Sequence, residues 1–174
     1  MPLLNDKVAI VTGASSGIGR AVALRFSNEA ARVVINARNK PKLDDVCKAI
    51  QALGGQCSIV VGDTGLQETH EELVQVAIRE FKGLDVSINN AGTVGPVKPL
   101  AEVCPSDWQE TLKTYLTAAF LGARSQIPAM LHRGGGSIVF TSSFVGTSVG
   151  LPGMSAYGAS KAALMGLVKG ITAD

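Results

Sequence analysis

The stretch of this sequence that most constrains its fold is Lys7–Arg20, KVAIVTGASSGIGR. The apolar run Val8–Val11 predicts a buried strand, and a helical pattern follows from Ala21 to Phe26. Three glycines stand between them, and glycine lets a backbone turn tightly and approach a ligand closely. Strand, glycine-rich turn and helix together predict a phosphate-binding turn, with the helix N-terminus facing the anion. A tight turn without a ligand is the alternative, because three residues separate the first two glycines.

Apolar runs and helical patterns alternate along the rest of the chain. We expect further strands at 32–37, 57–61, 84–89 and 137–141, and helices at 42–53, 68–81, 106–131 and from 156 towards 174. Apolar strands that alternate with helices predict a parallel sheet covered on both faces. Right-handed crossovers make this a doubly wound, Rossmann-type α/β fold with at least five strands. A length of 174 residues predicts a single domain over residues 1–174.

The composition argues against several classes of protein. Hydrophobic residues make up 46% of the chain, which argues against disorder, and a net charge of +2 with scattered basic residues argues against nucleic-acid binding. No apolar run approaches the roughly 20 residues of a membrane span, and no signal peptide is recognisable at the N-terminus. Three cysteines without close pairing or metal-ligand spacing predict reduced thiols in a cytoplasmic protein, and no metal site.

Glycine-containing and polar loops follow four of the five predicted strands. These loops are 12–19, Asp63-Thr64, 89–92 and Ser142-Ser143. The carboxyl ends of parallel strands lie at one edge of a sheet, where doubly wound proteins bind their ligands. We therefore expect the four loops to converge on one site.

Tyr157 and Lys161 are four residues apart on the last predicted helix, so they share a face. An ammonium group beside a phenol favours the phenolate, which helps a tyrosine to transfer a proton near neutral pH. An exposed pair on a solvated face is the alternative for this pattern taken alone. Ser143, with Ser142 as a weaker candidate, follows the fifth strand, where a hydroxyl could bond a substrate carbonyl. An ordinary loop serine is the alternative there.

Taken together, these motifs resemble the short-chain dehydrogenase/reductase family. Residues 12–19 resemble its cofactor turn, and Asp63 resembles its aspartate near the adenine ring. Residues 89–92, Asn-Asn-Ala-Gly, resemble the signature that braces the sheet and lines the cofactor cleft. Residues 157–161 resemble its Tyr-x-x-x-Lys pair, with Ser143 in the upstream serine position. The resemblance covers nearly the whole chain, in the family's order.

The resemblance implies hydride transfer between a nicotinamide cofactor and a carbonyl or secondary alcohol. Tyr157 would be the acid/base, Lys161 would hold the nicotinamide ribose and make Tyr157 a stronger acid, and Ser143 would orient the substrate oxygen. The expected cofactor-binding residues are Gly13, Ser15, Ser16, Gly17, Ile18, Gly19, Arg38, Asp63, Thr64, Asn90, Ala91, Gly92, Tyr157 and Lys161. The family commonly forms dimers or tetramers, so we expect a homo-oligomer. The apolar faces at 112–123 and 162–167 fit such contacts and core packing equally well.

The end of the second predicted strand favours NADP(H) over NAD(H). A carboxylate about 20 residues after the glycines usually binds the ribose hydroxyls of NAD, whereas an arginine accepts the 2′-phosphate of NADP. Here the strand ends Asn36-Ala37-Arg38, without an acid. Arg38 can pair with a phosphate in bidentate fashion, although a solvated surface arginine is the alternative. NAD(H) is the second choice. In the family, NADP sites often have a second basic residue within the glycine turn, and this chain has Ser16 at that place.

Two departures from the family pattern limit these expectations. The family usually has an asparagine in the long helix before the fifth strand, which holds a water that relays protons to the lysine. Tyr115 stands at that position here, which places the relay in doubt. The family also continues after the helix that carries the Tyr-x-x-x-Lys pair, with a sixth strand, a substrate-covering segment and usually a seventh strand. We therefore expect an exposed sheet edge here. A catalytically silent dinucleotide-binding or interaction module is therefore the second hypothesis.

Overall fold

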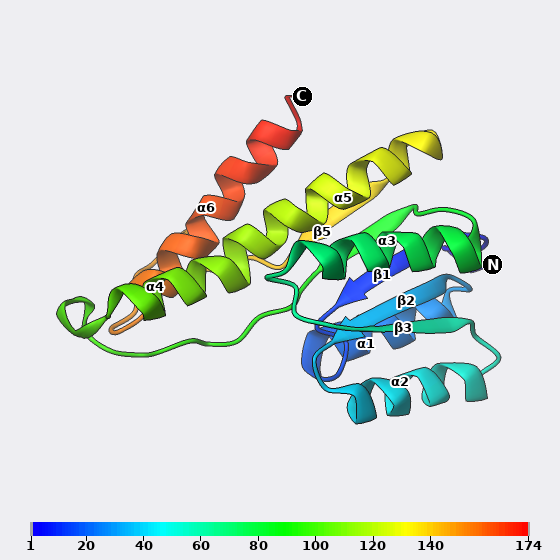
Figure 1. Cartoon of the computed structure of the whole chain (residues 1–174), viewed down its shortest axis with the longest axis horizontal. Helices are drawn as coiled ribbons and strands as arrows, with labels where there is room; N and C mark the ends of the chain where they lie inside the picture. The colour runs from blue at the N-terminus through cyan, green and yellow to red at the C-terminus, as the bar shows by residue number, and fades with distance from the viewer. Residues whose placement is uncertain (1, 174) are drawn as a thin grey trace.

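The computed structural model describes residues 2–173, in which strands and helices alternate as expected (Figure 1). The strands are β1 (Val8–Thr12), β2 (Arg32–Ala37), β3 (Cys57–Val61), β4 (Val86–Asn89) and β5 (Ser137–Phe140). The helices are α1 (Gly17–Asn28), α2 (Lys40–Ala52), α3 (Gln67–Phe81), α4 (Pro105–Leu112), α5 (Ala118–His132) and α6 (Ser155–Ile171). A 3-10 turn, η1 (Leu100–Glu102), precedes α4, and a π-helical turn, η2 (Lys113–Thr117), joins α4 to α5.

The five strands form one parallel sheet in the order β3-β2-β1-β4-β5. The chain reverses its direction of winding between β3 and β4, so the crevice at the carboxyl ends of β1 and β4 is the expected ligand position. Helices α1 and α2 cover one face of the sheet, while α3, α5 and α6 lie on the other side (Figure 1). The predicted doubly wound Rossmann-type architecture is confirmed.

The two faces explain why the strands are apolar along their whole length. Ala9 and Val11 pack with α1 and α2 in one core, whereas Val8 and Ile10 pack with α3 and α5 in another. Successive side chains of a strand point to opposite faces, so a strand covered on both sides has no solvent-facing position. All five residues of β1 are buried for this reason.

Several element boundaries differ from the prediction. Helix α1 begins at Gly17 rather than at Ala21, because the extended backbone of Ser16 ends the turn earlier than the apolar pattern shows. The helix predicted over 106–131 is interrupted by the π-helical turn. The last helix ends at Ile171, and Asp174, towards which it was predicted to run, lies outside the described residues.

Strand β5 lies at the edge of the sheet and is less buried than the central strands. Val139 is 46% exposed, and an apolar groove of about 460 Å³ opens between α5, β5 and α6. The exposed apolar residues of α6 include Met165 and Val168. The expected exposed sheet edge is therefore present in the described residues, and an apolar face of α6 is exposed beside it.

Asp85 joins the starts of β1 and β4 to the end of α5. Its carboxylate accepts a hydrogen bond from the Val8 N–H at 2.9 Å and lies 3.2 Å from Arg133 Nη2 and 3.5 Å from Lys7 Nζ. Burial opposes ionisation of Asp85, but the Val8 hydrogen bond and the Arg133 guanidinium outweigh it and hold the pKa of this carboxyl below its ordinary value.

We therefore expect Asp85→Ala to lower the free energy of unfolding by about 2–3 kcal/mol at pH 7, because it removes charge-assisted hydrogen bonds. Because the pKa of Asp85 is lower in the folded than in the unfolded chain, its ionised carboxylate stabilises the fold above pH ~4. That contribution is lost as pH falls through the folded-state pKa. The difference between wild type and variant should therefore shrink in urea titrations as the pH is lowered from 7 to 3.

Asp44→Ala is the matched control, since Asp44 pairs with Lys40 on the surface of α2. An exposed ion pair of this kind is worth about 0.5 kcal/mol or less. Equal destabilisation by the two variants, or a pH-independent effect of Asp85→Ala, would contradict the assignment.

Candidate active site

The segment from the end of β1 to the first turn of α1 has no room for a side chain at two of its positions, Gly13 and Gly19. Gly13 has φ +67, and a Cβ there would lie 2.8 Å from Ala91 Cα. A Cβ on Gly19 would lie 2.4 Å from the Gly13 carbonyl oxygen. Ser16 precedes α1 without capping it through its side chain, which leaves the first N–H groups of the helix available. The turn thus offers unpaired donors and a close backbone approach, as a pyrophosphate requires.

The loop after β4 is held against this turn by Thr12 and Asn90. The Thr12 hydroxyl oxygen accepts hydrogen bonds from the Asn90 N–H at 2.9 Å and the Ala91 N–H at 3.1 Å. The Asn90 amide donates to the Thr12 carbonyl at 3.2 Å, and its oxygen accepts from the Thr141 hydroxyl at 3.1 Å. Asn90 therefore braces the ends of β1, β4 and β5 and does not line the cleft beside it.

A cleft of about 260 Å³ opens at the carboxyl ends of β1, β2 and β3. The predicted cofactor residues that line it are Gly13, Ser15, Ser16, Arg38, Asp63, Thr64, Ala91 and Gly92. Its other lining residues, which are not among the predicted cofactor-binding residues, are Asn36, Ala37, Asn39, Gly62, Thr93, Glu110 and Thr114. These residues fit the adenosine and phosphate part of a dinucleotide, because the cleft adjoins the free end of α1 and carries an exposed arginine at its rim.

Six predicted cofactor-binding residues do not line that cleft, namely Gly17, Ile18, Gly19, Asn90, Tyr157 and Lys161. Gly17 and Gly19 shape the turn, and Ile18 is 64% exposed at the start of α1. Asp63 is partly committed to its own loop, since its carboxylate accepts from the Gly65 N–H at 2.9 Å and lies 3.8 Å from Lys113 Nζ.

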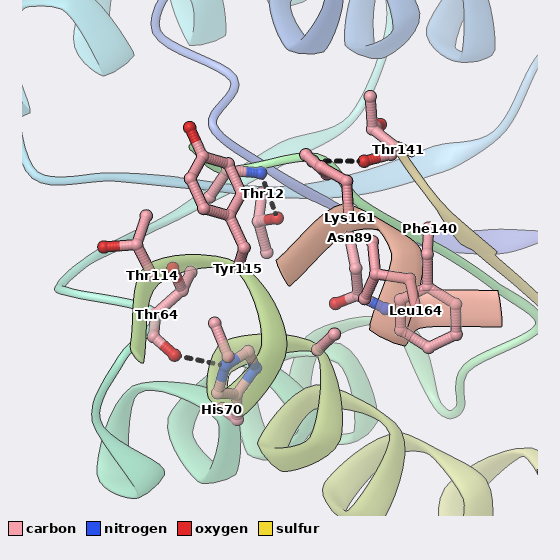
Figure 2. Close-up of a pocket in the computed structure, with 13 residues that line it drawn as sticks. Thr12, Thr64, His70, Asn89, Thr114, Tyr115, Phe140, Thr141, Lys161 and Leu164 are labelled. Atoms are coloured by element: carbon pink, nitrogen blue, oxygen red, sulfur yellow. Dashed lines mark hydrogen bonds between the residues drawn. The ribbon is translucent and has the colours of Figure 1, made fainter. Parts of the chain in front are cut away.

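Lys161 is buried, and its ammonium donates a hydrogen bond to the Thr141 carbonyl at the end of β5 (Figure 2). The ammonium nitrogen lies 5.7 Å from the centre of the Tyr157 ring, one helical turn earlier on α6. Burial lowers the pKa of Lys161 to about 8. The structure thus brings the predicted Tyr157–Lys161 pair to the sheet edge that carries the cleft, and Lys161 is not on a solvated helix face.

The two candidate serines lie in the loop after β5. The Ser143 hydroxyl oxygen accepts from the Val145 N–H at 3.1 Å, and the Ser142 hydroxyl donates to the Lys161 carbonyl at 3.4 Å. Within residues 2–173, no hydrogen bond joins Ser143 to Tyr157. Ser143 is held by its own loop, with lone-pair capacity and its proton still available for another group.

Two buried side chains near the pair, Tyr115 and His70, were not among the predicted site residues. Tyr115 contacts both Lys161 and Tyr157, with its ring centre 4.4 Å from the Lys161 ammonium. His70 donates its Nε2–H to the Thr64 carbonyl at 2.8 Å, and burial lowers its pKa (Figure 2). The only sequence signal for Tyr115 is its departure from the family asparagine; His70 gave none.

Among residues 2–173, no helix is both long and apolar enough to cross a membrane. The same residues hold no group of three or more His, Cys, Asp or Glu side chains arranged to bind a metal ion.

Known proteins are similar to this chain in sequence and in fold over most of its length. A 3beta-hydroxysteroid dehydrogenase of Mediterraneibacter gnavus is 36% identical over 174 residues, which are 100% of this chain and 62% of that protein. The crystal structure of a 3-ketoacyl-ACP reductase from Sinorhizobium meliloti 1021 superposes with a TM-score of 0.90 at 35% identity, over 92% of this chain and 64% of that one. The crystal structure of a short chain dehydrogenase from Shigella flexneri complexed with NADP superposes with a TM-score of 0.87 at 36% identity. The match covers 95% of this chain and 70% of that one.

The chain spans between 61% and 65% of the length of the first three curated relatives that it matches. A sequence model of the family described as short chain dehydrogenase matches residues 7–174, which include both the glycine turn and the Tyr157–Lys161 pair. The chain therefore belongs to the short-chain dehydrogenase/reductase family.

Proposed function

We propose that this protein is an NADP-dependent oxidoreductase that interconverts a carbonyl group and a secondary alcohol. The observation that carries the proposal is a single sheet edge that presents both a cleft beside the glycine turn and the Tyr157–Lys161 pair. The names of two similar proteins, a hydroxysteroid dehydrogenase and a ketoacyl reductase, support the same reaction class. A similar structure complexed with NADP supports the choice of cofactor.

The chain's own residues would bind, orient and transfer protons around the reacting groups. Bound nicotinamide would supply or accept the hydride. Tyr157 would give a proton to the substrate oxygen during reduction and take it back during oxidation. Lys161 would hold the nicotinamide ribose, with its positive charge favouring the ionised tyrosine. Ser143 would orient the substrate oxygen through its hydroxyl.

A catalytically silent dinucleotide-binding module is the second candidate. Tyr115 favours it, because it replaces the asparagine that the family uses for its proton relay. The two candidates differ in a direct experiment on the 174-residue chain. NADPH binding by calorimetry is expected under both, whereas oxidation of NADPH with a panel of ketones and aldehydes is expected only under the first. Binding without turnover of any carbonyl would favour the silent module, and absence of binding would contradict both.

Arg38 provides a test of cofactor choice, because it is exposed at the rim of the cleft. Replacement by aspartate should weaken NADPH binding by about 10- to 100-fold, since it removes a charge-assisted bond to the 2′-phosphate and adds repulsion. NADH binding should be unchanged or stronger, because a carboxylate suits the ribose hydroxyls. Calorimetric titration of each cofactor measures both effects.

Arg79→Gln is the matched control, because Arg79 is an exposed arginine on α3 outside the cleft. It should leave both affinities unchanged. An Arg38→Asp variant that still preferred NADPH would show that Arg38 does not select the cofactor.

A further inference from the structure

The side chain of Tyr115 connects the cofactor cleft with the Tyr157–Lys161 pair. Its ring centre lies 4.4 Å from the Lys161 ammonium and 5.2 Å from the centre of the Tyr157 ring, with the two ring planes at 89°. Its hydroxyl oxygen accepts a hydrogen bond from the Thr93 N–H at 2.8 Å, and Thr93 lines the cleft. One buried side chain, 6% exposed, thus contacts three groups of the site.

The backbone around Tyr115 is shaped for these contacts. The π-helical turn Lys113–Thr117 interrupts an otherwise continuous helix, and turns of this kind are frequent at functional sites. The opposing loop comes close to the ring: a Cβ at Gly92 would lie 2.6 Å from Tyr115 Cε1. The tyrosine therefore fits against this loop because residue 92 is a glycine.

The groups around Lys161 indicate that the Tyr115 ring stabilises the charge of the buried ammonium. Tyr157 faces it from its own helix and Tyr115 from η2, and His70 of α3 lines the same small cavity as Lys161. In the described part of the chain, residues 2–173, no carboxylate lines that cavity. The face of an aromatic ring attracts a cation, most strongly where water is excluded. The Tyr115 ring therefore offsets part of the cost of burying the charged ammonium.

We propose that Tyr115 is a positioning residue for the reaction proposed above, on which this inference rests. Its ring holds the Lys161 ammonium next to Tyr157, and its hydroxyl anchors Thr93 in the loop that lines the cofactor cleft. The phenol oxygen is directed to Thr93, so Tyr115 acts through its neighbours and does not itself transfer the proton. Two parts of the same side chain thus have separate tasks. Tyr115→Phe removes the hydroxyl alone and Tyr115→Met removes both the hydroxyl and the ring, so a comparison of the two variants separates the tasks.

Tyr115→Met keeps much of the apolar volume and removes the aromatic face. Its expected effect is to lower the pKa of Lys161 by about 0.5 to 1 pH unit, since a cation–π contact favours the charged amine. The pKa is measured by NMR on the 174-residue chain with ¹³C-labelled lysine, with the Lys161 resonance identified by its loss in Lys161→Arg.

Tyr115→Phe keeps the ring and removes the acceptor. It should leave the pKa of Lys161 unchanged and speed hydrogen exchange of the Thr93 amide by about 3- to 10-fold, which corresponds to the loss of one hydrogen bond. Phe81→Leu, a buried aromatic of α3 outside the site, is the control and should change neither measurement.

An unchanged or raised pKa of Lys161 in folded Tyr115→Met would overturn the role of the ring. Unchanged exchange of Thr93 in Tyr115→Phe would overturn the anchoring role. Neither measurement depends on turnover. A chain that oxidises no NADPH would therefore overturn the proposed reaction, while these two results still decide whether Tyr115 holds Lys161 and Thr93.

Discussion

Replacing Tyr157 with phenylalanine is expected to lower kcat for carbonyl reduction by about 10²- to 10⁴-fold, the usual contribution of a positioned acid or base. The variant keeps the ring that meets Tyr115 edge-on, so the packing of α6 should persist. The phenol oxygen alone is lost, and with it the proton that the substrate oxygen would receive. Steady-state oxidation of NADPH with a carbonyl substrate measures kcat, and calorimetry measures cofactor affinity, which should change by less than about threefold.

Ser58→Ala is the control for Tyr157→Phe, because it also removes one hydroxyl, here on β3, where that hydroxyl bonds Glu80 outside the site. Its turnover should equal that of the wild type. Normal turnover by Tyr157→Phe would show that another group supplies the proton. A loss of cofactor affinity equal to the loss of turnover would show instead that the phenol acts mainly in binding.

Gly19→Ala is expected to abolish most cofactor binding, with a loss of affinity of about 100-fold or more, equal to about 2.7 kcal/mol. The new Cβ would lie 2.4 Å from the Gly13 carbonyl oxygen and 2.8 Å from the Asn90 amide nitrogen. The first of these contacts is with backbone, so the turn itself must move away from α1. We also expect a loss of about 1–3 kcal/mol in the free energy of unfolding, as is typical for overpacking. Calorimetric titration of NADPH and urea denaturation measure the two effects.

Gly166→Ala is the matched control, because Gly166 lies on an exposed part of α6 and a Cβ there would meet no atom within 4 Å. Alanine in a helix interior is about 0.5–1 kcal/mol more favourable than glycine, so this variant should be slightly stabilised and should bind NADPH normally. If Gly19→Ala behaved in the same way, the turn would not require glycine and its assignment as a phosphate-binding turn would be wrong.

The order of strands and helices was predictable because burial on both faces leaves a simple record in the sequence. An apolar strand such as Val8–Val11 cannot face water on either side, and the helices between strands have apolar residues on one face only. The meeting of the loops at one sheet edge also followed, since parallel strands all end there. Boundaries were less certain, because Gly17 begins α1 with no apolar side chain to mark it.

Part of the site was predictable for the same reason. Residues four apart on a helix share a face, which places Tyr157 near Lys161. The contacts of Tyr115 were not, because they join η2 to α6 and to the loop after β4. Nor does a local pattern reveal which groups the Asn90 side chain bonds, or that a π-helical turn interrupts a long helix. Such features depend on groups that are distant in sequence.

The sequence by itself determined the doubly wound sheet, the glycine turn and the spacing of Tyr157 and Lys161, since each depends on local periodicity or on a backbone position that excludes side chains. Tertiary structure alone decided the environment of these groups. It buries the Lys161 ammonium beside the face of the Tyr115 ring and directs the Tyr115 hydroxyl to Thr93. It also places the Asp85 carboxylate where it joins the starts of β1 and β4 to the end of α5. The physical reason is that burial and charge partners arise only when segments far apart in the chain pack together.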